Sequence, residues 1–105
     1  MEDLYAKFLP QFVTLARARV GGALTAVTRR DHAATSTIVR ELHSLAGEAG
    51  LLGLSDVIPL ARDGEHKAKQ LDLSRGEADA RALMNTLHQL ERAIESLATA
   101  DRSKR

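Results

Sequence analysis

The chain of 105 residues contains no cysteine, which excludes disulfide bonds and thiolate metal sites. The absence of cysteine also suits a reducing compartment. Aromatic residues make up only 3% of the chain, so we expect an aliphatic core of packed helices. The 15 basic and 14 acidic residues nearly cancel, and no basic stripe dominates one face. This balance predicts no contact with nucleic acid.

Long apolar runs are also missing, and none approaches the length that spans a membrane. Residues 1–4 lack the basic start and the apolar run of a signal peptide. We therefore expect a cytoplasmic protein without a membrane contact. A chain of this length suffices for one four-helix domain but not for an additional ATP-binding kinase domain. The predicted domain covers residues 1–100, and residues 101–105 form a charged tail.

Apolar residues recur at helical spacing through most of the chain, and the first predicted helix is short. This amphipathic helix covers residues 2–9, its inward side chains being Leu4, Tyr5, Phe8 and Leu9. Pro10 then suits a helix start or a kink. A longer helix follows from Gln11 to the sequence Arg29-Arg30-Asp31, with inward positions Phe12, Leu15, Ala16, Val20, Ala23, Leu24 and Val27.

Three further helices are predicted from caps and apolar stripes. Asp31 caps a helix over residues 32–52, and Ser55 caps the next one, which ends at a turn over 72–73. The inward stripe of the helix that Ser55 caps is Leu54, Ile58, Ala61, Glu65 and Ala68. Ser74 and Glu77 have the spacing of a capping box. The last helix has the stripe Ala80, Leu83, Leu87, Leu90, Ile94 and Leu97. The fold class is all-α, a monomeric antiparallel four-helix bundle with a short extra N-terminal helix.

His43 lies off the apolar stripe of its predicted helix, about 100° around the axis from Leu42. Gly47 and Gly50 lie on the same face as His43. Each glycine inside a helix costs roughly 1 kcal/mol relative to alanine, so two on one face indicate a compensating benefit. The simplest benefit is access, because a second protein can then approach the imidazole closely.

The sequence His43-x-Leu45-x-Gly47, followed by Ala49 and Gly53, resembles the signature of histidine-containing phosphotransfer (HPt) domains. The resemblance covers most of the chain, because the other helices also fall where that family has them. It implies a phosphoryl carrier in a two-component relay, with His43 as the phosphoacceptor. The implied partners are a sensor histidine kinase and a response-regulator receiver domain. The carrier needs no cofactor of its own, since the receiver supplies the Mg²⁺ ion and the acceptor aspartate.

The resemblance also suggests roles for three other side chains. Glu65 lies 22 residues after His43, where the family often has glutamine or glutamate, and would accept a hydrogen bond from one ring N–H. Lys69, 26 residues after His43, and Arg40, one turn before it, are candidates to stabilise the phosphoryl group. The chain departs from the family at Ala46, where a basic residue is usual. Glu65, Lys69 and Arg40 could each instead be an ordinary solvated residue at the edge of its helix.

Two other functions remain open at this point. The chain could be a regulator that binds a receiver or kinase without being phosphorylated, a reading that Ala46 favours. It could also be a dimerisation and phosphoacceptor domain of a kinase, although its four long helices argue against that. The other histidines, His32, His66 and His88, do not predict a metal site, because no pair has the i, i+4 spacing of a helical site.

Overall fold

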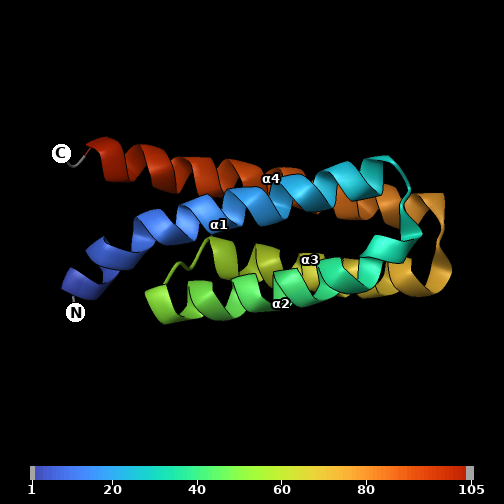
Figure 1. Cartoon of the computed structure of the whole chain (residues 1–105), viewed down its shortest axis with the longest axis horizontal. Coiled ribbons are helices and arrows are strands. Elements are labelled where there is room, and N and C mark those ends of the chain that lie inside the picture. Colours follow the sequence, from blue (N-terminus) through green and yellow to red (C-terminus); the bar gives the residue numbers. More distant parts are fainter. Residues whose placement is uncertain (1, 104–105) are drawn as a thin grey trace.

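The computed structural model describes the backbone of residues 2–103 and the side chains of residues 5–100. Within these residues there are four long helices, which are in chain order α1 (Glu2–Thr28), α2 (Thr35–Leu52), α3 (Val57–Ser74) and α4 (Glu77–Ser103). Each helix runs antiparallel to the next, so the N- and C-terminal ends lie at the same end of the bundle (Figure 1). The packed pairs are α1 with α2, α2 with α3, α3 with α4, and α4 with α1. The structure therefore confirms an all-α four-helix bundle.

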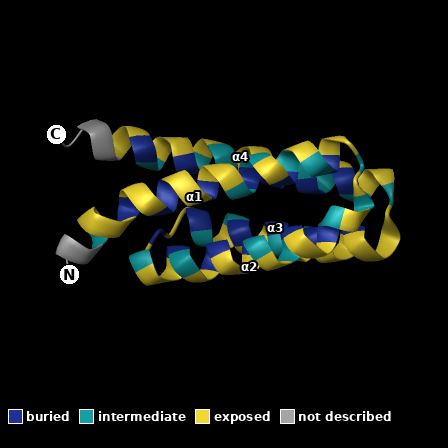
Figure 2. Ribbon diagram, in the orientation of Figure 1, coloured by how far each residue is buried: buried dark blue, intermediate teal, exposed yellow. Residues whose placement is uncertain are grey.

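The core runs along the bundle axis, where the buried faces of the helices meet (Figure 2). The stripe predicted for α4 is confirmed: five of its residues are completely buried and Leu97 is partly buried. These five are Ala80, Leu83, Leu87, Leu90 and Ile94. Such regular periodicity identifies a helix reliably, because every apolar side chain falls on one face.

The prediction of a separate N-terminal helix is wrong, because α1 continues without interruption through Pro10. Proline removes one backbone hydrogen bond, but buried residues on both sides of it, Leu9 and Phe12, hold this segment against the core. Two residues expected to point inward, Phe8 and Leu15, are instead 37% and 50% exposed. The predicted inward position of Leu4 lies outside the described side chains.

The second helix is close to its prediction, with differences at its start. Residues His32–Ala34 form a 3₁₀ turn, η1, before α2 begins at Thr35. The side chain of Asp31 makes no capping hydrogen bond, although its carbonyl accepts one from the Ala34 N–H at 3.1 Å. α2 ends where predicted, at Leu52, and is capped by Gly53, whose φ of 68° lies in the left-handed region that glycine adopts most easily.

The third helix is shifted relative to its prediction at both ends. It begins at Val57 rather than after a Ser55 cap, and it continues through the expected turn at 72–73 to Ser74. Asp72 can remain in the helix because its carboxylate accepts a hydrogen bond from the Thr35 hydroxyl at 2.6 Å. This contact ties the end of α3 to the start of α2.

The predicted capping box between Ser74 and Glu77 does not form. The Ser74 hydroxyl accepts a hydrogen bond from the Gly76 N–H at 3.0 Å and donates one to Asp79 at 2.5 Å. The Glu77 carboxylate binds Arg30 of the loop that follows α1. At the other end, α4 continues to Ser103, so the described part of the predicted tail is helical.

Candidate functional site

His43 projects from the exposed side of α2, as its position off the apolar stripe predicts. Its neighbour Leu42 is almost completely buried, whereas the His43 side chain is 76% exposed. Gly47 and Gly50 are exposed on the same side of the helix. A Cβ atom added at either glycine would have no neighbouring heavy atom within 4 Å. No other described side chain therefore covers the helix surface at these two glycines.

Glu65 of α3 is the polar group that contacts the imidazole. Its two carboxylate oxygens, Oε1 and Oε2, lie 3.3 and 3.2 Å from His43 Nδ1. The Glu65 side chain is only 16% exposed, so it lies at the edge of the core rather than on the core-facing stripe that was expected. Because an ionised carboxylate can only accept hydrogen bonds, this contact assigns the ring proton to Nδ1. The other ring nitrogen, Nε2, then keeps its lone pair.

The close approach of α3 to α2 depends on Gly64, which sequence reasoning missed. Gly64 is buried, and a Cβ atom there would lie 3.1 Å from Leu42 Cδ1 and 3.6 Å from Thr86 Cγ2. Leu42 and Gly64 immediately precede His43 and Glu65, so their contact brings the imidazole and the carboxylate together. The signal available in the sequence was the helical spacing of small and apolar residues that are buried in α3: Val57, Ala61, Gly64, Ala68 and Leu71.

The two candidate cations differ in what they contact. Lys69 Nζ lies 3.3 Å from Glu65 Oε2, the same oxygen that lies nearest His43 Nδ1. Lys69 therefore joins the His43–Glu65 pair. Arg40 is exposed and donates a hydrogen bond to Thr37 of its own helix at 3.3 Å. Ala46, where a basic residue is usual in the resembling family, is 7% exposed.

An apolar groove lies between the N-terminal half of α1 and the C-terminal end of α2. Its volume is about 440 Å³, and its lining residues are Phe8, Gln11, Phe12, Leu15, Glu48, Leu51 and Leu52. Among the described side chains, this groove gathers three of the four large hydrophobic residues that are exposed, because Leu51 is 86% exposed alongside Phe8 and Leu15. His43, Gly47 and Leu51 follow one another at intervals of four residues on α2. The groove thus adjoins the open face of the histidine.

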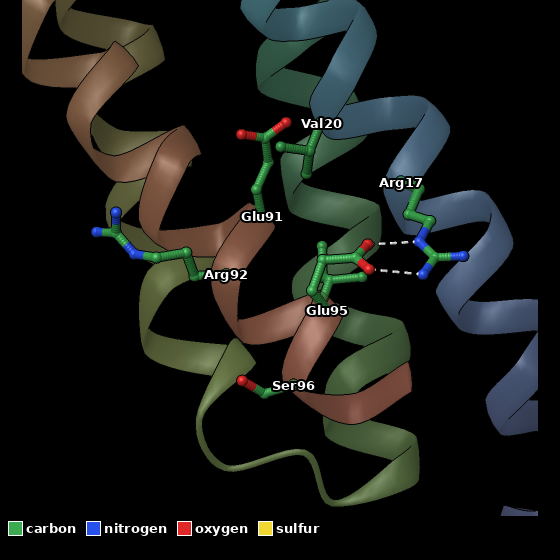
Figure 3. A pocket seen from close by; sticks show the side chains of 7 residues that line it. Arg17, Val20, Glu91, Arg92, Glu95 and Ser96 are labelled. Atoms are coloured by element: carbon green, nitrogen blue, oxygen red, sulfur yellow. Dashed lines mark hydrogen bonds and ion pairs between the residues drawn. The ribbon is translucent and has the colours of Figure 1, made fainter. Parts of the chain in front are cut away.

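A second groove, of about 590 Å³, lies between α1 and α4 on the side of the bundle away from the α2–α3 pair (Figure 3). Its charged side chains include Arg17, whose guanidinium makes two hydrogen bonds to Glu95 at 2.5 and 2.7 Å. None of the described residues that line this groove is a histidine.

His88 forms a second histidine–carboxylate pair, within α4. Its Nδ1 lies 3.1 Å from Glu91 Oε1, and the two side chains are 57% and 45% exposed. This pair lies on a single helix, with the residues three positions apart, and has no adjoining face of glycines. His88 is therefore a useful control for chemistry at His43. In the described part of the chain, no group of three or more histidine, cysteine, aspartate or glutamate residues could hold a metal ion.

The fold and the site define a four-helix bundle that displays one histidine beside a carboxylate from the neighbouring helix. The Hpt domain family model matches residues 7–100, and the chain belongs to the Hpt domain family. This membership supports a phosphotransfer role in two-component signalling, with kinases and receivers of a phosphorelay as the class of partner. Comparisons with curated proteins and with solved structures give no match. Across the described residues, no helix is both long and apolar enough to cross a membrane.

Proposed function

We propose that this protein carries a phosphoryl group on His43 Nε2 between a sensor histidine kinase and response-regulator receiver domains, or between two receivers. The observation that carries the proposal is the exposed imidazole whose Nδ1 lies 3.2 Å from the Glu65 carboxylate. That contact orients the ring and leaves Nε2 free as the nucleophile. The carrier acts stoichiometrically.

In the proposed transfer, the Nε2 lone pair attacks the phosphorus atom of a receiver's phosphoaspartate. The N–P bond forms as the P–O bond to the aspartate carboxylate breaks, and the electron pair of that bond stays on the aspartate. The Nδ1 proton stays in place beside Glu65, so the ring gains positive charge next to a negative group. The reverse reaction passes the phosphoryl group to the aspartate of the next receiver. Phosphoryl transfer requires mainly positioning and charge stabilisation, which suits a site with few polar groups.

The charge on the phosphoryl group is balanced mainly by the partner. The receiver contributes its Mg²⁺ ion, and this chain needs no metal of its own. Arg40, one turn before His43 on an exposed face, is a cation that the chain can contribute, whereas Lys69 is bound to Glu65. A receiver that reaches Nε2 also covers Gly47, Gly50 and the adjoining apolar groove. The proposed carrier is a cytoplasmic monomer, because its partners act in the cytoplasm and one chain completes the bundle.

Ala46 supports a second candidate, a regulator that binds a receiver or kinase but accepts no phosphoryl group. Incubation with a receiver that carries a radioactive phosphoryl group distinguishes the two functions. A carrier becomes labelled, and His43→Gln abolishes the label while His88→Gln does not. A regulator binds the receiver but remains unlabelled. A kinase dimerisation domain would instead have the mass of a dimer in solution, which sedimentation measures.

A further inference from the structure

Lys69 and His43 contact the same oxygen of Glu65. The Lys69 ammonium lies 3.3 Å from Glu65 Oε2, and His43 Nδ1 lies 3.2 Å from it. The three groups therefore form a chain that runs from the exposed Lys69, through the mostly buried Glu65, to the exposed imidazole. An interaction that holds the Glu65 carboxylate in place therefore also restrains the imidazole.

Two physical effects make Lys69 suited to hold this carboxylate. A glutamate four residues before a lysine on a helix is the more favourable orientation of such a pair. A carboxylate that has lost most of its contact with water also gains more from a neighbouring cation than a fully solvated one does. Without Lys69, the Glu65 side chain would have more freedom to turn away from Nδ1.

Lys69 is poorly placed, in this arrangement, to contact a phosphoryl group directly. Its ammonium is bound to the carboxylate on the Nδ1 side of the ring, whereas the transferred group would be bonded to Nε2. We propose that Lys69 is a positioning residue, which acts through Glu65 to keep His43 in the tautomer that is protonated on Nδ1. The benefit of this tautomer for transfer rests on the proposed function, but the tautomer itself is a property of the unphosphorylated protein.

The chain offers a matched control for the loss of charge at Lys69. Arg62 is an exposed cation on α3, three residues before Glu65, so it lies about as far along the helix from Glu65 as Lys69 does. No interaction joins Arg62 to Glu65 among the described side chains. Lys69→Met and Arg62→Met each remove one positive charge, but only Lys69→Met removes the contact with Glu65.

The test measures the His43 tautomer by nitrogen-15 NMR of the ring, at a pH well above the titration range of histidine. In the wild-type protein we expect the form protonated on Nδ1 to predominate. Lys69→Met should lower the ratio of this form to the form protonated on Nε2 by about twofold, the equilibrium effect of one helical ion pair. Lys69→Arg should largely retain the wild-type ratio, and Arg62→Met should leave it unchanged.

Two results would overturn the role of Lys69. The first is an unchanged tautomer ratio in Lys69→Met. This result would count against the role even if the variant destabilised an existing phosphohistidine. The second is an equal change in Arg62→Met, which would indicate a general effect of charge. If the ratio falls as expected but phosphorylated receivers never label the wild-type chain, the proposed function fails and the role of Lys69 stands. If wild type is labelled and the ratio does not change, only the role of Lys69 fails.

Discussion

His43 is set apart from the buried residues of α2 by a rotation of about 100° around the helix axis. That rotation places its side chain in solvent, 76% exposed, while Leu42 fills the core. Because the ring contributes little to packing, its chemistry can be changed with little effect on the fold. The same separation lets the Glu65 carboxylate contact the imidazole from the edge of the core.

Glu65→Ala should slow phosphoryl transfer without stopping it, because the nucleophile remains but its orientation is lost. Hydrogen bonds to charged groups contribute about 1.5–3 kcal/mol, which corresponds to roughly a tenfold to hundredfold loss of rate. The measurement is the initial rate of labelling by phosphoramidate, a small donor. A rate equal to that of wild type would show that the Glu65 contact does not serve the reaction.

Gly47→Gln should block access to His43 without weakening the protein. A side chain at position 47 leans back toward the imidazole, where it would obstruct a receiver. The space around the glycine is empty, and replacing a helical glycine improves helix propensity by up to about 1 kcal/mol. We expect transfer from a receiver to fall, unfolding stability to be retained or raised, and labelling by phosphoramidate to change little. An equal loss with both donors would mean that Gly47 shapes the chemistry rather than the access.

At the scale of the helices, the site depends on how closely α3 approaches α2. Gly64 allows Leu42 to pack against the α3 backbone, and the next residue on each helix belongs to the His43–Glu65 pair. Gly47 lies on an open face and Gly64 in a packed one, so a side chain would have room at position 47 but would meet Leu42 at position 64.

Gly47→Ala and Gly64→Ala should therefore differ in stability, although both gain the same helix propensity. The methyl group at position 64 would lie 3.1 Å from Leu42 Cδ1, and overpacking in a core typically costs 1–3 kcal/mol. We expect the free energy of unfolding of Gly64→Ala to be about 1 kcal/mol or more below that of Gly47→Ala. Urea denaturation measures this difference. Equal stabilities would show that α3 can move away from α2 at little cost.

The helices themselves were predictable from sequence wherever one periodic stripe dominates, as in α4. The ends of the helices were harder to predict, because contacts between residues far apart in the sequence determine them. Asp72 has the chemistry of a turn residue, but the Thr35 hydroxyl, 37 positions away, binds its carboxylate within α3. Likewise, Pro10 does not end α1, since core contacts on both sides compensate for one missing hydrogen bond. Neither the Thr35–Asp72 hydrogen bond nor the core packing around Pro10 can be predicted from the neighbouring residues in the sequence.

The pairing of His43 with Glu65 was predictable from their spacing and from family resemblance. The supporting packing at Gly64 was not, because the stripe of α3 was assigned one residue away from its true centre. That shift also explains why Glu65 was expected to face the core directly. The apolar groove involving Phe8 and Leu15 was missed, since helical periodicity does not reveal which apolar side chains lack a neighbour.

At the scale of the whole molecule, ion pairs connect α1 and its following loop to the rest of the bundle. Arg19 binds Glu48 of α2 at 2.6 Å, and Arg30 binds Glu77 of α4 at 2.5 Å. Hydrogen bonds from Arg30, and secondarily from Arg81, lower the pKa of Glu77 from its ordinary value of 4.5 to about 2. Hydrogen bonds from Lys67 and Thr86 also lower the pKa of Asp63.

A carboxyl group whose pKa is lower in the folded state stabilises the protein at high pH and loses that effect on acidification. The contribution of Glu77 is thus complete above its unfolded pKa of 4.5 and disappears as the pH falls to about 2. Glu77→Gln should be less stable than wild type at neutral pH and should lose less stability on acidification. Urea denaturation at several pH values in this window measures the free energy of unfolding of both proteins. The control is Glu41→Gln, which removes a carboxylate that makes no ion pair with another described side chain. An identical acid response of Glu77→Gln and wild type would contradict the linkage.

The most direct measurement of the central claim is the position of the phosphoryl group on the protein. Nitrogen-15 NMR of the histidine rings, recorded before and after phosphorylation by a receiver, identifies both the residue and the ring nitrogen. We predict that the new N–P bond forms at Nε2 of His43, because Glu65 lies against Nδ1 at 3.2 Å. His88, whose Nδ1 is also paired with a carboxylate, should remain unmodified. A phosphoryl group on Nδ1 of His43, or on another histidine while His43 stays unmodified, would contradict the proposed mechanism.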